Sequence, residues 1–567
     1  MRTIFFKVSA VLLPLLLMIA TEGVIRLFGH TEFFIPVQGK PEFQTVNPAY
    51  AGRYFRGFVP QLAYNPFLKQ KPDSVFRVVA LGGSSTAGYP YLFNSGFPER
   101  VAARLRSSEP VRQVEMINLG MTALSSHVLR DMIPHVKKIS PDVVLIYAGH
   151  NEYYGAYGAG GIDRNLAFTR TLLWFKKSVL FRGLEKIISP PVQSNRTMMA
   201  QSTSDVSVVM DGPVYDTGIQ NFEKNLGAIL QSLNQAGIQV YIGTLTSNLQ
   251  GQPPLGVNTS ASEAWKEGIQ SWGVGDTTAA MNSFLRAKEY DPVRFRAPQI
   301  MNDVIKRTAA AHGAIVVDIE THFNSSVGDS LFTDHLHPTA LGYDLMAQVF
   351  FGALGDNFMN QSSYLNAPDP SRFDAAYARL LIERLRLGFP FMEGLTEEEE
   401  LQMFGRILQV HLESERSADS LAAMVVQGSL PVYEALLETH KHDLISSDTM
   451  QALAHMRSLL YWQPFNERLH YQAAELASRQ SSNLAGEVLQ LVVARDPSEL
   501  YLNTLAALRL RQGAMRASKT LLNWVESVNP ESSVMLYNMA RYLVQAGDTL
   551  NAERYFRRYQ RAIASDP

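Results

Sequence analysis

The sequence predicts an α/β domain built on a parallel sheet, followed by a C-terminal domain made only of helices. Two patterns support this prediction. Between residues 76 and 320, short apolar runs that end in Gly or polar turns alternate with segments of helical periodicity, which is typical of parallel strands joined by crossover helices. From about residue 366 such runs stop, and Pro464, Pro497 and Pro530 recur with a period of 33 residues.

Length and composition exclude several classes of protein. A chain of 567 residues is too long for one core, so more than one domain is expected. Its 46% hydrophobic and 18% charged residues are ordinary for a folded protein, and the net charge of −2 gives no reason to expect nucleic acid as a partner. Because Cys is absent, disulfides, thiolate metal sites and a Cys nucleophile are excluded.

The first 28 residues predict a membrane anchor. Arg2 and Lys7 precede an uncharged stretch at 8–20, and the apolar character continues to Phe28. A cleaved signal peptide and a soluble helix stay open as alternatives, although residues 20–23 match a cleavage site poorly. An anchor or a signal would place the rest of the chain outside the cytoplasmic membrane, in the periplasm.

Residues 29–75 show no sustained period and are interpreted as a spacer. The α/β domain, expected over 76–360, then begins with an apolar run that ends in Gly-Gly. Strands are expected at 76–81, 114–119, 143–148, 240–245 and 315–319. Helices are expected at 97–105, 129–139, 222–236 and 304–312.

Gly-rich or polar turns follow the first three strands, and a further polar motif follows the fifth. In parallel sheets, sites form beyond the carboxyl ends of the strands, so these turns are expected to meet. They contain Gly82-Gly83-Ser84, Gly120, Asn151 and the Asp334-to-His337 motif.

The order and spacing of these motifs resemble the four blocks of the SGNH, or GDSL-type, serine hydrolase (esterase) superfamily, over about 76–355. The resemblance implies a flavodoxin-like three-layer sandwich and hydrolysis of ester bonds. One departure leaves the subfamily open: the common Gly-Asp-Ser-Leu has Gly83 and Ser85 in place of Asp and Leu.

A chemical role follows for each residue. Ser84 is the expected nucleophile, and His337 accepts its proton and later donates it to the leaving alcohol. Asp334 orients the imidazole ring and stabilises its charged form. The backbone N–H groups of Ser84 and Gly120 and the side-chain amide of Asn151 are the expected oxyanion-hole donors.

Each motif alone has an ordinary explanation, because Ser and Asp are common helix caps, and only their joint order favours a site. His150 and His335 match no motif position and are interpreted as structural or substrate-facing. No cofactor is predicted. No metal is predicted either, because His335 and His337 would point to opposite sides of an extended chain.

Two further segments have open interpretations. Residues 153–205 are aromatic and basic, which suits a lid or acyl-binding wall, a membrane-contacting stretch, or an ordinary helical insertion. Arg294 and Arg296 are interpreted as partners of acidic neighbours or, alternatively, of an anionic substrate.

The helical segments resemble tetratricopeptide repeats. An insertion at 258–293 and the part of the C-terminal domain (366–567) from about 440 onward carry small residues and prolines at matching offsets, as in Gly547, Ala552 and Phe556, and less regular helices precede that part. A repeat solenoid would bind a peptide or protein partner on its concave face, whereas a plain helical domain would bind none.

Together these features predict a membrane-anchored, extracytoplasmic serine esterase. Its substrate is expected to be an acyl ester of a small molecule, a lipid or an acylated glycan. Two alternatives stay open: an O-acyltransferase acting on envelope glycans, because the same triad serves both reactions, and an inactive envelope scaffold that binds proteins through its repeats.

Overall fold

The fold was analysed in a computed structural model of the 567-residue chain. The structure describes residues 13, 16–18, 20–25, 32–55, 60–108, 113–160, 166–188, 196–197, 199–200, 207–324, 328, 330–354, 369–415 and 417–564.

A five-stranded parallel sheet forms the centre of the first domain, as the sequence predicts. The strand order is β5-β4-β6-β7-β8. The strands are β4 (Val75–Gly82), β5 (Gln113–Asn118), β6 (Val143–Tyr147), β7 (Gln239–Gly243) and β8 (Ile315–Val317). Because β5 and β6 lie on opposite sides of β4, the chain changes direction there, and in sheets of this kind sites form beyond the carboxyl end of that strand. The last strand is shorter than expected, since Ile319 already begins helix α13 (Ile319–Asn324).

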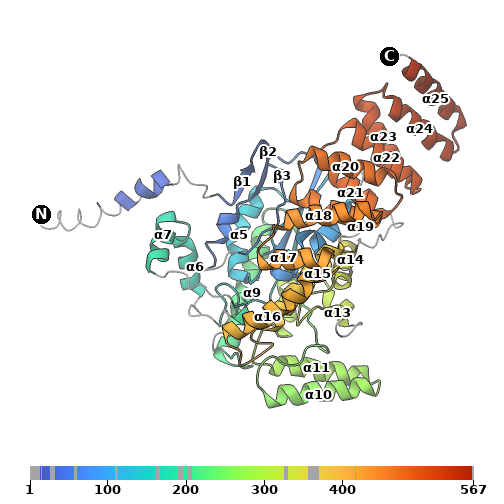
Figure 1. Ribbon diagram of the computed structural model, residues 1–567. Coiled ribbons are helices and arrows are strands. Elements are labelled where there is room, and N and C mark those ends of the chain that lie inside the picture. Colours follow the sequence, from blue (N-terminus) through green and yellow to red (C-terminus); the bar gives the residue numbers. More distant parts are fainter. Residues whose placement is uncertain are drawn as a thin grey trace, which may run out of the picture.

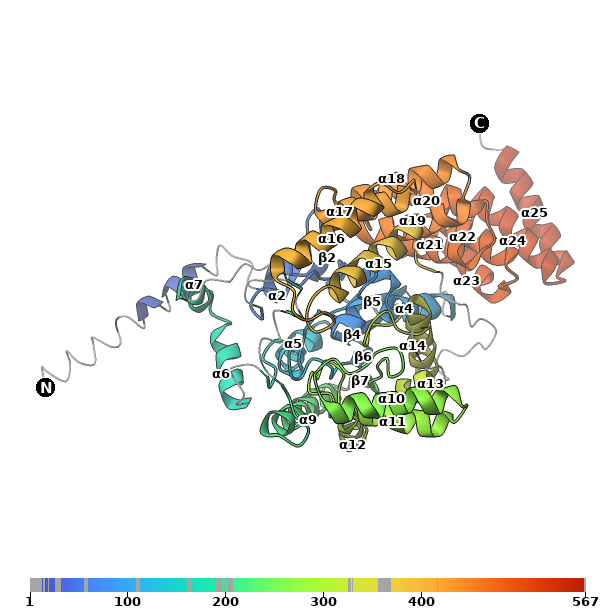
Figure 2. The ribbon, with the colours of Figure 1, turned by 60° about the horizontal axis from the view of Figure 1, so that its bottom comes forward.

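Helices cover both faces of the sheet. One face carries α4 (Phe97–Ser108) and α14 (Ala340–Ala353), which pack on each other. The other carries α5 (Ser126–Lys138), α9 (Pro213–Asn234) and α12 (Ile300–His312). Each helix buries an apolar stripe, such as Phe97, Val101 and Leu105 of α4, which are 0% exposed. The predicted three-layer α/β fold is confirmed (Figure 2).

The segment 29–75, interpreted as a spacer, contains regular structure. Strands β1 (Phe34–Val37), β2 (Lys40–Val46) and β3 (Phe67–Leu68) form an antiparallel sheet. Aromatic residues tie it together, since the Phe34 and Phe67 rings meet edge to face at 5.1 Å. Short strands with many aromatics show little alternation in sequence, which is why the sheet was not predicted.

The expected insertion at 258–293 is a helix pair, α10 (Thr259–Gly273) and α11 (Thr277–Tyr290). The pair projects from the α/β domain (Figure 1). Gly268 allows the two helices to approach, because a Cβ at that position would lie 2.5 Å from the Phe284 ring.

The C-terminal region is entirely helical in the residues described from Arg372 onward, as the sequence predicts. Its helices are α15 (Arg372–Arg386), α16 (Glu397–Leu412), α17 (Ser417–Gln427), α18 (Val432–Ile445), α19 (Thr449–Trp462), α20 (Glu467–Ser478), α21 (Asn483–Val493), α22 (Glu499–Arg511), α23 (Met515–Val528), α24 (Ser533–Gln545) and α25 (Thr549–Ala564). Successive helices stack into an elongated array, and α21 packs against α4 of the α/β domain (Figure 1).

Most of the predicted anchor at 1–28 lies outside the described residues. Within the part of the chain that the structure describes, no helix has the length and apolar character needed to span a membrane.

Candidate active site

Ser84 lies where the central strand ends. Strand β4 runs to Gly82, Gly83 follows in an extended conformation, and Ser84 is the first residue of the short helix α3 (Ser84–Ala87). Glycine at position 83 leaves room for Asn151, because a Cβ there would lie 2.6 Å from the side-chain nitrogen of Asn151 and would displace that amide. The turn therefore holds Ser84 at the carboxyl end of β4, with the residue only 8% exposed.

Ser84, His337 and Asp334 form a continuous chain of hydrogen bonds. His337 Nε2 lies 2.7 Å from Ser84 Oγ, and His337 Nδ1 lies 2.6 Å from Asp334 Oδ2. The serine and the histidine are 253 residues apart in sequence, and the fold brings them together at the carboxyl ends of the strands. This geometry suits proton transfer from a serine hydroxyl to an imidazole that a carboxylate orients.

The local fold holds Asp334 as an anion. Its Oδ1 accepts the backbone N–H groups of Leu336 and His337, at 2.9 and 2.8 Å. Burial by itself would raise the pKa of Asp334, but His337 and His335 outweigh it and hold the pKa well below its usual range. A permanently charged carboxylate can stabilise an imidazolium on its neighbour.

Asn151 lies beside the proposed nucleophile. Its Nδ2 donates to the Leu124 carbonyl at 3.2 Å and lies close enough to Gly83 to exclude a Cβ there. The Ser84 N–H is in the first turn of α3, where a helical N–H has no acceptor within the helix. Two of the three expected oxyanion-hole donors thus lie at the turn that carries Ser84.

The third expected donor is already engaged. The Gly120 N–H donates to Asn118 Oδ1 at 2.9 Å, while Asn118 Nδ2 donates to the Thr86 carbonyl at 2.9 Å. In this structure the Gly120 N–H therefore has an acceptor within the protein, and its role as an oxyanion-hole donor stays a prediction. Asn118 belongs to the Asn-Leu-Gly turn that the sequence marks after the second strand, but the sequence alone assigns no role to its side chain.

Aromatic and imidazole side chains surround the site, and the sequence marks only some of them. Tyr89 packs edge-on against the His337 ring, with centroids 4.6 Å apart, and no sequence motif marks it. His150 is buried. This burial, and secondarily electrostatic repulsion from His335, lowers the pKa of His150 to about 3. His150 is therefore neutral, and its Nδ1 accepts the Ala297 N–H at 3.2 Å.

His335 corrects the reasoning about metals. Its Nδ1 lies 3.3 Å from Asp334 Oδ1, so both imidazoles face Asp334 instead of pointing apart. One ligand atom from each of Asp334, His335 and His337 falls within 4.8 Å of the others, a spacing that a metal ion could bridge. Both nitrogens of His337 already take part in the chain to Ser84, which favours the hydrogen-bonded arrangement.

The helical region reaches the same site. Arg386 of α15 donates to the Thr333 carbonyl at 2.9 Å, and the Thr333 N–H in turn donates to the His337 carbonyl at 2.8 Å. Tyr89 donates to the Leu381 carbonyl of α15 at 3.4 Å. Helix α15 therefore supports both the loop that carries His337 and the ring packed on it.

The two arginines noted in the sequence have structural partners. Arg296 pairs with Asp291 at 3.0 Å and also donates to two carbonyls, and Arg294 donates to the Val208 and Lys288 carbonyls. These bonds favour the interpretation as structural groups. Of the proposed lid at 153–205, the described part includes α6 (Leu166–Phe175) and α7 (Val179–Ile188), which leaves the three interpretations open.

Comparison with protein families gives one match. Residues 80–345 match the model of the GDSL-like lipase/acylhydrolase family, and this region includes Ser84, Gly120, Asn151, Asp334 and His337. The matched region is a GDSL-like lipase/acylhydrolase domain, and the protein is accordingly a hydrolase of ester bonds.

Comparison with curated proteins gives no match. Among solved structures, one similar chain is a putative lipolytic protein of the G-D-S-L family from Desulfitobacterium hafniense DCB-2, at 15% identity over 49% of this chain and 98% of that chain, with a TM-score of 0.25. Another is a catalytic mutant of an acetylxylan esterase from Geobacillus stearothermophilus, at 15% identity over 52% and 100% of the two chains, with a TM-score of 0.29.

Proposed function

We propose that the GDSL-like acylhydrolase domain in residues 80–345 is an active serine esterase that works through Ser84, His337 and Asp334. The observation that carries this proposal is the unbroken hydrogen-bond chain from Ser84 Oγ through both His337 nitrogens to Asp334 Oδ2, at 2.7 and 2.6 Å. In a site that had lost its activity, these three side chains would not be expected to stay within hydrogen-bonding distance of one another.

The reaction proceeds in two halves. Ser84 Oγ attacks the ester carbonyl carbon while His337 Nε2 takes the hydroxyl proton, and the imidazolium then gives that proton to the departing alcohol. In the second half, water attacks the acyl-Ser84 ester, again with His337 as base, and the carboxylic acid leaves. The Ser84 N–H and the Asn151 amide stabilise the negative oxygen of each tetrahedral intermediate.

The enclosure of the site favours a compact acyl group. Ser84 is 8% and His337 is 6% exposed, and the Tyr89 ring lies against the imidazole. We expect p-nitrophenyl acetate to be cleaved faster than the butyrate and octanoate esters.

The decisive test is Ser84→Ala, assayed with p-nitrophenyl acetate. Removing the nucleophile of a triad leaves only a small residual rate, so kcat is expected to fall by about 10³-fold or more. Ser107→Ala, a change on α4 outside the site, serves as the matched control. Full activity in Ser84→Ala would show that another residue is the nucleophile.

Acyl transfer to a glycan hydroxyl is the alternative outcome for the same acyl-enzyme. It is distinguished by supplying an acetyl donor with an oligosaccharide acceptor and measuring acetylated sugar against free acetate. Free acetate alone supports hydrolysis, while acetylated sugar at a comparable rate supports transfer.

We further propose that residues 1–28 anchor the enzyme in the cell membrane with its catalytic domain outside the cytoplasm. The support is the sequence: Arg2 and Lys7 before the uncharged stretch 8–20. The test is fractionation followed by protease digestion of spheroplasts. A chain in the membrane fraction that protease degrades supports the anchor, whereas a shortened chain in the periplasmic fraction supports a cleaved signal.

The C-terminal helices are proposed to be degenerate tetratricopeptide-like repeats. Gly513 and Gly547, 34 residues apart, both adopt positive φ, at 74° and 80°, in the turn between paired helices. This repeated geometry favours a solenoid over an irregular helical domain.

A further inference from the structure

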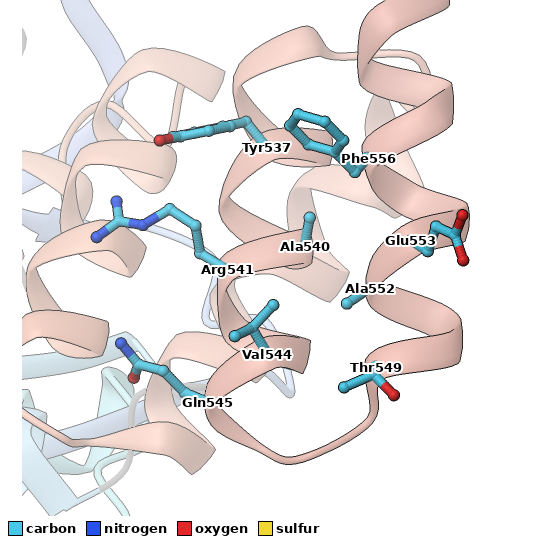
Figure 3. A pocket seen from close by; sticks show the side chains of 9 residues that line it. All are labelled: Tyr537, Ala540, Arg541, Val544, Gln545, Thr549, Ala552, Glu553 and Phe556. Atoms are coloured by element: carbon cyan, nitrogen blue, oxygen red, sulfur yellow. The ribbon is translucent and has the colours of Figure 1, made fainter.

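An apolar groove of about 470 Å³ runs between the last two helices, α24 and α25 (Figure 3). Ala540 and Ala552 lie between the helices, where small side chains keep the groove open. Three larger side chains line it and are exposed: Tyr537 by 42%, Val544 by 61% and Phe556 by 41%. Apolar side chains gathered in one groove, instead of scattered singly, are typical of a binding surface.

The preceding helix pair carries the same groove with its occupant in place. Helices α22 and α23 precede α24 and α25 by 34 residues, in the register set by the two turn glycines. Helix α24 packs against both α22 and α23. The positions equivalent to the groove residues are 0–2% exposed there, namely Asn503, Ala506, Leu510, Ser518 and Leu522.

Helix α24, which packs on α22 and α23, shows what kind of element fits the groove between α24 and α25. Helix α24 buries Met535, Leu536 and Met539, at 0%, 0% and 2% exposure, and these residues form one apolar stripe along the helix. The groove on α24 and α25 continues this stacking interface by one further step. Since the stripe of α24 is already buried against its own chain, a second copy of the protein has no free α24 stripe to offer.

We propose that the groove between α24 and α25 binds an amphipathic helix of a partner protein, seated as α24 is seated on α22 and α23. The partner's apolar stripe packs between Tyr537, Val544 and Phe556. Arg541 of α24 and Glu553 of α25 both line this groove, so a partner helix with an acidic side chain near Arg541 and a basic side chain near Glu553 is favoured. Binding of this kind is helix-in-groove recognition.

The test uses the full-length protein and a fluorescein-labelled peptide with the sequence of residues 532–546, the segment that fills the equivalent groove. We expect a saturable rise in fluorescence anisotropy. Val544→Asp in the full-length chain is expected to weaken binding at least about tenfold, since it introduces a charge into the apolar contact. Val528→Asp is the matched control, because Val528 is 75% exposed on α23 and does not line the groove.

Further outcomes decide against the proposal. The absence of saturable binding, or equal binding by Val544→Asp and the unaltered chain, would overturn it, provided that circular dichroism shows both to be folded. A peptide with Met535→Asp and Met539→Asp must fail to bind. If sedimentation shows a dimer that Val544→Asp dissociates, the occupant is a second copy and the partner helix is rejected.

Discussion

The Asn151 amide is the side chain that most directly tests stabilisation of the oxyanion. It lies against Gly83, and one of its N–H groups holds the Leu124 carbonyl at 3.2 Å, which fixes its orientation. Losing one such donor costs about 3 kcal/mol in the transition state, so Asn151→Ala is expected to lower kcat by about 10²- to 10³-fold with little change in KM. Steady-state kinetics with p-nitrophenyl acetate measures this.

The control for that prediction is Asn523→Ala, at an exposed position of α23. An Asn151→Ala enzyme with unchanged kcat would remove the amide from the oxyanion hole and leave the backbone N–H of Ser84 as its principal donor.

Glu152, next to Asn151, gives the stability a pH dependence. Its carboxyl group is buried and bonds to the N–H and hydroxyl of Ser126, at 2.7 and 2.6 Å, and burial raises its pKa to about 7. Between pH 4.5 and 7 the unfolded chain loses this proton while the folded chain keeps it, so the free energy of unfolding falls as pH rises. The resulting loss in the free energy of unfolding is about 3 kcal/mol at most. This loss is complete once the pH is above about 7, where Glu152 is ionised in the folded chain too.

Glu152→Gln removes the titrating group but keeps an acceptor for Ser126. Urea unfolding at pH 5 and pH 8 is expected to show a smaller loss of stability with rising pH in the variant than in the unaltered protein. Equal losses in the two proteins would mean that Glu152 does not titrate in this range.

Single residues also show where sequence reasoning ends. Ser84, Asn151, Asp334 and His337 could be identified because each stands in a turn at the carboxyl edge of the sheet. The bond from Gly120 to Asn118 and the Tyr89 ring on His337 could not, because both depend on how separate loops approach each other. Tertiary contacts of this kind leave no periodic signal along the chain.

Strand β4 carries a buried ion pair that joins the N-terminal sheet to the central one. Arg77 is 0% exposed and bonds to Glu115 on β5 at 2.8 Å, to the Leu68 carbonyl of β3 and to the Ile139 carbonyl, both at 2.6 Å. Arg77→Met leaves the Glu115 charge buried without its partner, and the free energy of unfolding is expected to fall by about 3–5 kcal/mol. Chemical denaturation measures this loss.

The double variant Arg77→Met with Glu115→Gln provides the comparison. It removes both charges, so part of the lost stability is expected to return. If the loss of stability in the double variant equals the sum of the losses caused by Arg77→Met and Glu115→Gln alone, the two side chains act independently.

The elements differ in how well the sequence predicts them. The strands of the parallel sheet are continuous apolar runs because both faces are covered, and this signal located all five to within a few residues. The sheet formed by β1, β2 and β3 packs through aromatic rings, as in the edge-to-face pair of Phe33 and Tyr50 at 4.7 Å. Its short strands carry no clear alternation, so contacts across the chain decide their pairing.

The α/β and helical regions are held together by buried polar contacts behind the site. Asp374 of α15 accepts the Leu92 N–H at 2.8 Å and the Ser95 hydroxyl. Tyr461 of α19 donates to Glu99 of α4, and Asn94 donates to Ser458 at 3.0 Å. Leu92 and Ser95 belong to the same loop as Tyr89, so the helical region is a structural support of the catalytic site.

Asp374→Ala tests this coupling between regions. The change leaves the Leu92 N–H and the Ser95 hydroxyl without their acceptor inside the interface, where Asp374 is 0% exposed, so the free energy of unfolding is expected to fall by about 3 kcal/mol. Because the loosened loop carries the Tyr89 ring away from His337, kcat is expected to fall several-fold as well.

Asp369→Ala, at an exposed position just before α15, is the control and is expected to change neither quantity. Calorimetry and esterase kinetics on the same samples separate the two effects: lower stability with unchanged kcat would limit the helical region to holding the fold, whereas a loss of both supports its role in positioning the histidine.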